Sequence, residues 1–281
     1  MNPPAREPCR ILVDGQRIEC RRIGDAGRSA PVIVFLHEGL GSVRMWRDFP
    51  DRLCATAGLP GLVCSRLGYG ASDPLPGPRN ARFMHEEATS ALPALLRACE
   101  IDRPILFGHS DGASIALIHA GTFPEVARAV IVLAPHLFVE PVCVTSIAAI
   151  SRDYAGPALR ERLARYHADV DGAFHGWSDV WLSGEFAAWN IEDAVAASRC
   201  PILAIQGEND QYGTMRQIER IAELRPDARL VRLPDCRHSP QFDRPDEVIA
   251  ATGEFLHSLG GRGNAREPHR HPGLAGDPRR T

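Results

Sequence analysis

A serine flanked by glycines is the first group in this sequence whose surroundings suit chemistry. Ser110 stands in Gly-His-Ser-Asp-Gly (108–112), directly after the apolar run 104–107 and before a segment of small residues. A strand that turns sharply into a helix would lift the Ser110 hydroxyl clear of a sheet, and the glycines would let strand and helix approach closely. Free N–H groups at the helix start would favour negative charge forming there. The segment predicts a nucleophile; the alternative is an ordinary turn after a buried strand.

A serine hydroxyl is a poor nucleophile near neutral pH, so it needs a base and a group that orients the base. His238 and Asp210 each follow the end of an apolar run. Because strand ends at one edge of a parallel sheet converge, we expect both side chains near Ser110. Ser110 would attack a carbonyl, His238 would move the proton, and Asp210 would hold the imidazole and stabilise its charged form. Alone, His238 could be a surface histidine and Asp210 a helix cap, but the three together favour catalysis.

The elements that would position these residues alternate along the chain. Continuous apolar runs predict strands buried on both faces at 32–36, 62–65, 104–107, 129–134 and 201–206, and a last strand is expected at 228–233. Helical patterns lie between them at 43–57, 83–99 with a kink at Pro93, 214–224 and 243–259. An Asp-Gly pair inside 10–22 predicts an antiparallel hairpin. The alternation predicts a mainly parallel central sheet flanked by helices.

The alternation breaks after residue 135. Only helical patterns follow, at 142–154, 157–167 and 170–187, which predicts a helical insertion over the strand ends. We therefore divide the chain into a core (1–135), a helical cap (136–199), a second core part (200–259) and a tail (260–281). The tail has hardly any apolar residue, so we expect it to be disordered.

Aromatic residues concentrate in the expected cap. Trp177 and Trp181 are four residues apart and would share one helix face, with Phe174 nearby. Such rings can form the cap's own small core. They can also line an apolar pocket above Ser110, and we take these three as pocket candidates.

The motifs together resemble the α/β-hydrolase superfamily. They are the glycine-flanked serine at 108–112, the Gly-x-x-Asp ending at Asp210, and the His-x-Pro starting at His238. The resemblance covers 11–259 and implies the α/β-hydrolase fold with a helical cap.

The resemblance also implies an oxyanion hole formed by the backbone N–H groups of Gly39 and Asp111, although Gly39 can also be a simple turn residue. The family's usual His-Gly is His37-Glu38 here, which places a carboxylate beside a site for negative charge. Glu38 would then point away, pair with a base such as Arg44, or meet a cationic group of the substrate. We add His37 and Glu38 to the pocket candidates.

The function predicted is that of a serine hydrolase cleaving a small carboxylic ester, lactone or thioester whose apolar or aromatic part lies under the cap. The resemblance leaves two alternatives open: a carbon–carbon bond hydrolase of aromatic ring-cleavage products, and a ligand-binding protein that keeps the triad without turnover. It implies no cofactor and no metal.

Composition limits the other classes. With 44% hydrophobic and 24% charged residues the chain has the make-up of a globular enzyme, and a net charge of -3 gives nucleic-acid binding little support. The apolar runs are too short for a membrane span or a signal peptide, which predicts a cytoplasmic protein that does not engage membranes. Eight cysteines without a Cys-x-x-Cys pair predict buried thiols, not a zinc site. Nothing in the sequence indicates an oligomeric state.

Overall fold

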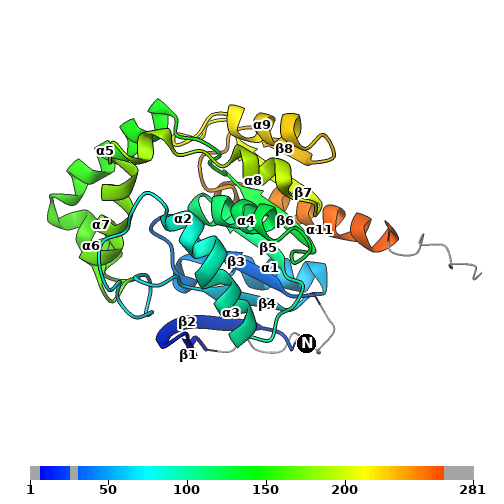
Figure 1. Cartoon of the computed structure of the whole chain (residues 1–281), viewed down its shortest axis with the longest axis horizontal. Coiled ribbons are helices and arrows are strands. Elements are labelled where there is room, and N and C mark those ends of the chain that lie inside the picture. Colours follow the sequence, from blue (N-terminus) through cyan, green and yellow to red (C-terminus); the bar gives the residue numbers. More distant parts are fainter. Residues whose placement is uncertain (1–6, 26–30, 263–281) are drawn as a thin grey trace, which may run out of the picture.

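An eight-stranded sheet forms the centre of the computed structural model, which describes residues 7–25 and 31–262 (Figure 1). In sheet order the strands are β1 (Cys9–Val13), β2 (Gln16–Ile23), β4 (Gly61–Cys64), β3 (Ile33–Leu36), β5 (Ile105–His109), β6 (Ala129–Leu133), β7 (Ile202–Gly207) and β8 (Arg229–Leu233). β1, β2 and β4 pair antiparallel, whereas the pairs from β4 through β3 to β8 are all parallel. The predicted mainly parallel sheet with an antiparallel hairpin at one edge is confirmed.

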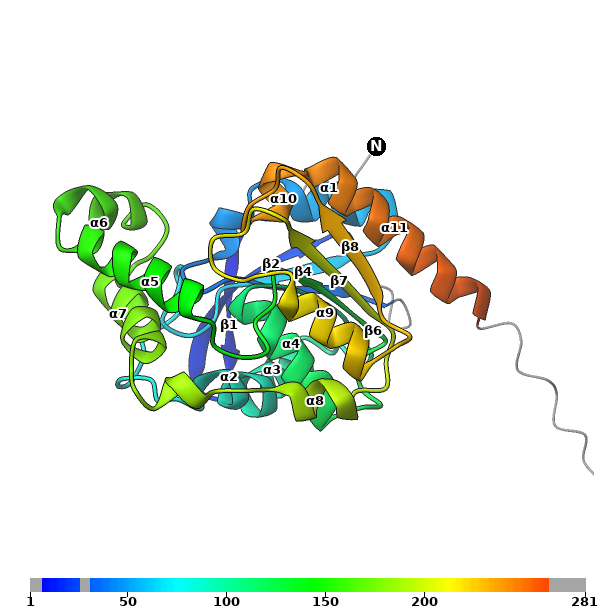
Figure 2. The ribbon, with the colours of Figure 1, turned by 90° about the horizontal axis from the view of Figure 1, so that it is seen from above.

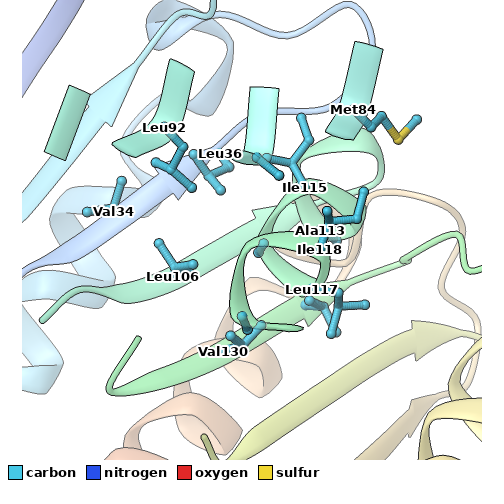
Figure 3. Packing of buried hydrophobic residues seen from close by; sticks show 14 of the residues in the cluster. Val34, Leu36, Met84, Leu92, Leu106, Ala113, Ile115, Leu117, Ile118 and Val130 are labelled. Atoms are coloured by element: carbon cyan, nitrogen blue, oxygen red, sulfur yellow. The ribbon is translucent and has the colours of Figure 1, made fainter. Parts of the chain in front are cut away.

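Helices cover both faces of this sheet. They are α1 (Phe49–Ala57), α2 (Phe83–Glu86), α3 (Leu92–Ala98), α4 (Asp111–Thr122), α8 (Glu192–Ala197), α9 (Arg216–Leu224), α10 (Pro240–Asp243) and α11 (Pro245–Arg262). Side chains alternate between faces along each strand: Leu36, Leu106 and Val130 pack with α2, α3 and α4 (Figure 3). Phe35 and Phe107 belong to the opposite cluster with α1 and α11. Burial on both faces explains why β3 to β7 have no polar alternation, whereas the edge strand β8 is partly exposed and contains Arg229 and Arg232.

Two predicted helices differ in detail from the structure. The pattern at 43–57 contains a 3-10 turn, η1 (Val43–Trp46), and α1 begins only at Phe49 because Arg47 has φ 54° and breaks the helical path. The helix predicted at 83–99 is interrupted by a π-helical turn, η2 (Glu87–Ala91), ahead of Pro93. Pro93 has no N–H to donate, and its ring clashes with the carbonyl four residues earlier. The helix therefore widens into a π-helical turn at this point, where the sequence predicted a kink.

Three further helices, α5 (Pro141–Tyr154), α6 (Pro157–Leu163) and α7 (Val170–Trp181), lie to one side of the sheet (Figure 2). The helix predicted at 170–187 ends at Trp181 and is followed by a 3-10 turn, η3 (Phe186–Ala188). α8 lies against α4 instead, so closely that a Cβ on Gly121 would be 2.1 Å from the Ala194 carbonyl oxygen.

The end of the chain is described only in part. α11 continues to Arg262, and the rest of the tail predicted at 260–281 lies outside the described residues. Among 7–25 and 31–262, none of the helices has both the length and the apolar character needed to cross a membrane. The eight cysteines are free thiols, and Cys9 alone among them is exposed.

Candidate active site

Ser110 occupies the turn between β5 and α4. Its backbone has φ 53° and ψ −120°, a conformation that costs a non-glycine residue about 1–3 kcal/mol. A Cβ on Gly112 would lie 2.1 Å from the Leu36 carbonyl oxygen, and one on Gly108 would lie 2.4 Å from that of Gly112. Glycine is therefore required on both sides of the serine. The Ser110 N–H donates to the Leu133 carbonyl at 2.9 Å, which anchors the strained turn to β6.

Asp210 and His238 form a close pair on the loops that follow β7 and β8. The His238 Nδ1 lies 2.9 Å from each carboxylate oxygen of Asp210. The Tyr212 N–H and the Gln206 amide also donate to this carboxylate, each at 2.7 Å. Burial raises the pKa of Asp210, but the adjacent His238 and the Tyr212 N–H outweigh burial and lower it overall. The ionised carboxylate fixes the proton of His238 on Nδ1, which leaves Nε2 free to accept one.

His109 connects His238 to the strand end that carries Ser110. The His109 Nε2 donates to the His238 carbonyl oxygen at 2.7 Å, and its Nδ1 lies 3.0 Å from the Gln241 amide nitrogen. The rings of His109 and His238 have their centroids 5.1 Å apart. In the described residues no hydrogen bond joins the Ser110 hydroxyl to His238. Such bonds commonly tighten only when substrate is bound.

Two backbone N–H groups are available beside Ser110. Within the described ranges, the N–H of Gly39 and that of Asp111 donate to no protein acceptor. Asp111 is the first residue of α4, a helix of 12 residues, so its N–H belongs to the positive end of the helix dipole. These are the two donors that the resemblance implies for an oxyanion hole.

The loop that carries Gly39 is held from within by His37 and Arg66. The His37 Nδ1 donates to the Glu38 carbonyl at 2.7 Å, and its Nε2 accepts the Arg66 N–H at 2.9 Å. The Arg66 guanidinium donates to the carbonyl oxygens of His37 and Glu38. Burial, assisted by the charge of Arg66, holds the pKa of His37 well below its usual range. Both ring nitrogens are hydrogen-bonded to backbone groups, so neither is free to bind a substrate. This differs from the pocket role predicted for His37.

The Glu38 side chain turns toward His109. Its Oε2 lies 3.5 Å from the His109 Nδ1, while Arg44 donates instead to the Arg165 carbonyl at 2.8 Å. Burial raises the pKa of Glu38, but His109 and the Arg66 guanidinium outweigh burial and lower it overall. The pairing with Arg44 considered from the sequence is therefore wrong, and the carboxylate lies beside His109 instead.

Two tryptophans of helix α7 contact the residues that carry these backbone donors. A Cβ on Gly39 would lie 2.1 Å from the Trp177 Nε1, so this indole rests directly on the glycine. The Trp181 Nε1 donates to the Asp111 carboxylate at 3.2 Å. Burial raises the pKa of Asp111. The i, i+4 pair of tryptophans thus contacts the two residues proposed for the oxyanion hole.

Phe174, the third predicted pocket ring, lies inside the cap. It is fully buried and stacks on Tyr154 with centroids 3.6 Å apart and planes 4° from parallel. The ring packs between α5 and α7. This position differs from the one in the pocket that the sequence predicted.

The sequence argument missed His109, Arg66 and His136. His136 follows β6, and its ring lies 5.8 Å from the His238 ring and 5.1 Å from the Trp181 ring. Burial lowers the pKa of His136 to about 3, so it adds no positive charge beside His238. The strand-end rule that selected Asp210 would have found His136. Across the described residues, no group of three or more His, Cys, Asp or Glu side chains has the arrangement of a metal site.

Comparisons with known proteins show the family and the fold of the chain. The sequence model described as the alpha/beta hydrolase family matches residues 33–251. Protein ABHD8 of Bos taurus is 28% identical in an alignment that covers 90% of this chain but only 62% of that protein. The 2-hydroxy-6-oxo-6-phenylhexa-2,4-dienoate hydrolase of Burkholderia cepacia is 23% identical, covering 83% of this chain and 90% of that protein. The solved enol-lactonase of Burkholderia xenovorans has a TM-score of 0.71 at 20% identity, covering 89% of this chain and 100% of that chain, a likeness that shows the fold.

Proposed function

Because the chain belongs to the alpha/beta hydrolase family, we propose that it is a serine hydrolase cleaving a small carboxylic ester, lactone or thioester through an acyl-enzyme. The observation that supports this most directly is the meeting of three strand ends. They bring the strained Ser110 turn to the same edge of the sheet as the Asp210–His238 pair, whose Nδ1 is 2.9 Å from the carboxylate.

In the acylation step the Ser110 Oγ attacks the carbonyl carbon while the His238 Nε2 takes the hydroxyl proton. The Asp210 carboxylate stabilises the resulting imidazolium. Collapse of the tetrahedral intermediate breaks the bond to the leaving group, which receives the proton from His238. The acyl group is then bound to Ser110 as an ester. In deacylation a water molecule takes the place of the leaving group, and the same proton transfers release the carboxylic acid.

The N–H groups of Gly39 and Asp111 would stabilise the oxyanion of both tetrahedral intermediates. Their orientation is fixed before substrate arrives, and loss of one such donor typically lowers kcat by about 100- to 1000-fold. The Glu38 carboxylate lies beside His109, and His109 and Arg66 stabilise its negative charge.

The substrate we propose has an apolar or aromatic part beside α7. Trp177 and Trp181 supply buried rings next to Gly39 and Asp111, and aromatic side chains favour apolar partners near such polar groups. The apolar part would therefore lie near the carbonyl that reacts with Ser110.

The test is steady turnover of a panel that contains p-nitrophenyl acetate and butyrate, a small lactone and an acyl thioester. We expect several turnovers per chain on at least one ester, and a fall in kcat of about four to six orders of magnitude in Ser110→Ala. Unchanged turnover in Ser110→Ala would contradict the proposal. A single stoichiometric burst without turnover would favour a ligand-binding protein.

A carbon–carbon bond hydrolase is the second candidate, favoured by the likeness to the Burkholderia cepacia relative along 90% of its length. The same three residues can serve that reaction, and the substrate pocket decides between them. Incubation with 2-hydroxy-6-oxo-6-phenylhexa-2,4-dienoate separates the two candidates. Release of benzoate with a kcat/KM above that for every ester of the panel would favour carbon–carbon cleavage.

A further inference from the structure

His167, between α6 and α7, is a buried cap residue that bonds to two loops of the core. It is only 4% exposed. Its Nδ1 lies 3.0 Å from the Gly70 backbone nitrogen, and its Nε2 lies 2.9 Å from the Leu40 carbonyl oxygen. The neighbouring Ala168 N–H donates to the Gly70 carbonyl at 2.8 Å. The cap is therefore hydrogen-bonded to the core at this point.

The two partners determine the protonation of the ring. A backbone N–H can only donate, so the Nδ1 that faces Gly70 must be an acceptor. The proton is then on Nε2, where it is donated to the Leu40 carbonyl. Burial lowers the pKa of His167, which agrees with a neutral ring. The His167 ring thus accepts a hydrogen bond from one loop at Gly70 and donates one to another loop at Leu40.

One of these loops carries the Gly39 donor. Leu40 follows Gly39 directly, and the tight turn between them is closed by the Gly41 N–H, which donates to the Glu38 carbonyl at 3.1 Å. Arg66 and His37 hold this turn from the core side. Two residues of the segment 136–199 also contact this turn: the Trp177 indole lies against Gly39, and the His167 ring bonds to Leu40.

We propose that His167 is a positioning residue that fixes the oxyanion loop, residues 37–41, from the cap. The inference rests on the proposed function, because the position of Gly39 matters only if its N–H stabilises an oxyanion. Without the bond to Leu40, the loop would gain freedom and the Gly39 N–H would point less accurately at the oxyanion. Because the oxyanion forms only in the transition state, the loss should appear in kcat and not in KM.

Three substitutions separate this role from simple packing. Glutamine places an amide N–H near the position of Nε2 and can keep the bond to Leu40, whereas asparagine places an amide oxygen near Nδ1 and can keep only the bond to Gly70. We expect kcat on p-nitrophenyl butyrate to fall about 10- to 100-fold in His167→Ala and His167→Asn, since displacing a donor costs less than removing it. We expect His167→Gln to stay within about threefold of wild type, with KM changing by less than about threefold in every variant.

His175→Ala is the matched control. His175 lies on α7, but its ring is exposed and its polar contact is with Asp179 on the same helix at 3.2 Å. We expect its kcat within about twofold of wild type, as for most surface substitutions. A raised KM with unchanged kcat in His167→Ala, or equal kcat in the Gln and Asn variants, would overturn the positioning role.

Amide hydrogen exchange tests the same contact without reference to turnover. In His167→Ala the N–H groups of Gly41 and Gly70 should exchange at least about tenfold faster, as local opening becomes easier, and in His175→Ala they should not. If wild type turns over none of the substrates, the proposed function fails while exchange still decides the contact. If wild type is active but exchange at Gly41 and Gly70 is unchanged, the inference fails and the proposed function stands. His167→Asn, which keeps a polar group in place but not the bond to Leu40, replaces His167→Ala if that variant does not fold, with faster exchange then expected at Gly41.

Discussion

The strand ends of the core and the inner face of α7 contribute to the same site in different ways. At the strand ends, Ser110, Asp210 and His238 stand on short loops whose geometry is fixed by the sheet, by required glycines and by hydrogen bonds. On α7, Trp177 and Trp181 reach the site through long side chains from one helix. In the proposed enzyme, the chemistry would be set where the backbone has least freedom. The choice of substrate would be set where side chains can be exchanged without moving the backbone.

The largest expected effect lies at the strand ends. Asp210→Asn removes the charge that stabilises the His238 imidazolium, so we expect kcat to fall about 10,000-fold while the melting temperature changes little. The measurement is kcat on the best ester of the panel, with circular dichroism for the fold. Glu208→Gln is the matched control, because Glu208 is an exposed carboxylate two residues away. Equal losses in both variants would show that the effect is not that of the Asp210–His238 pair.

Acidification should reveal buried neutral histidines in both regions. Burial lowers the pKa of His37 and His136 at the strand ends, of His167 in the cap, and of His119 on α4. The unfolded chain takes up protons on these rings near pH 6.5 while the folded chain does not, so the free energy of unfolding must fall as pH falls below 6.5. Between pH 7 and pH 5.5 the His136 ring, with its pKa lowered to about 3, contributes a loss of about 1 kcal/mol, and the other rings add to it.

Urea unfolding at several pH values measures this dependence. Asp210 does not interfere, because its lowered pKa keeps its titration below this pH range, whereas Asp111, whose pKa burial raises, acts in the opposite direction. In His167→Gln the free energy of unfolding should fall less between pH 7 and pH 5.5, because the contribution of His167 is removed. A free energy of unfolding that stays constant or rises from pH 7 to pH 5.5 would contradict the neutral assignments.

A smaller effect should separate the two aromatic environments of α7. Trp177→Leu removes the ring that rests on Gly39, and we expect the preference for aryl over short aliphatic acyl esters, as a ratio of kcat/KM, to fall about tenfold. Phe174→Leu is the control, since it changes the stack with Tyr154 inside the cap. It should lower stability and leave the preference within about twofold. A larger shift in preference for Phe174→Leu would reverse these assignments.

The smallest effect is expected for Glu38. Because its carboxylate faces His109, Glu38→Gln should change kcat/KM for neutral and amine-bearing esters by the same factor. The comparison needs two p-nitrophenyl esters that differ only in an amino group. A selective loss with the amine-bearing ester would instead place Glu38 in contact with a substrate cation.

The sheet, the glycines on either side of Ser110 and the convergence of Asp210 and His238 could be predicted from the sequence. Short continuous apolar runs between turn residues are typical of strands buried on both faces. The glycines around Ser110 are required because a Cβ there would clash with nearby backbone atoms. The rule that parallel strand ends converge then brings Asp210 and His238 to one edge. These features depend on local pattern and general topology, so they could be predicted.

The remaining features depend on partners far apart in the chain. Glu38 turns toward His109, 71 positions later, and His167 reaches back to Leu40, a separation of 127 residues. No local pattern encodes such pairs. The same holds for α7, where helical spacing placed Trp177 and Trp181 on one face but could not show that Phe174 faces Tyr154. Side-chain orientation in the cap requires coordinates.

The most direct test of the central claim is to identify the residue that carries the acyl group. Wild type and Ser110→Ala are mixed with p-nitrophenyl butyrate, quenched in acid within the burst, and analysed by intact mass and peptide mapping. We predict one butyryl group per wild-type chain, located on Ser110, and none in Ser110→Ala. A butyryl group on another residue, or continued turnover by Ser110→Ala without any adduct, would contradict it.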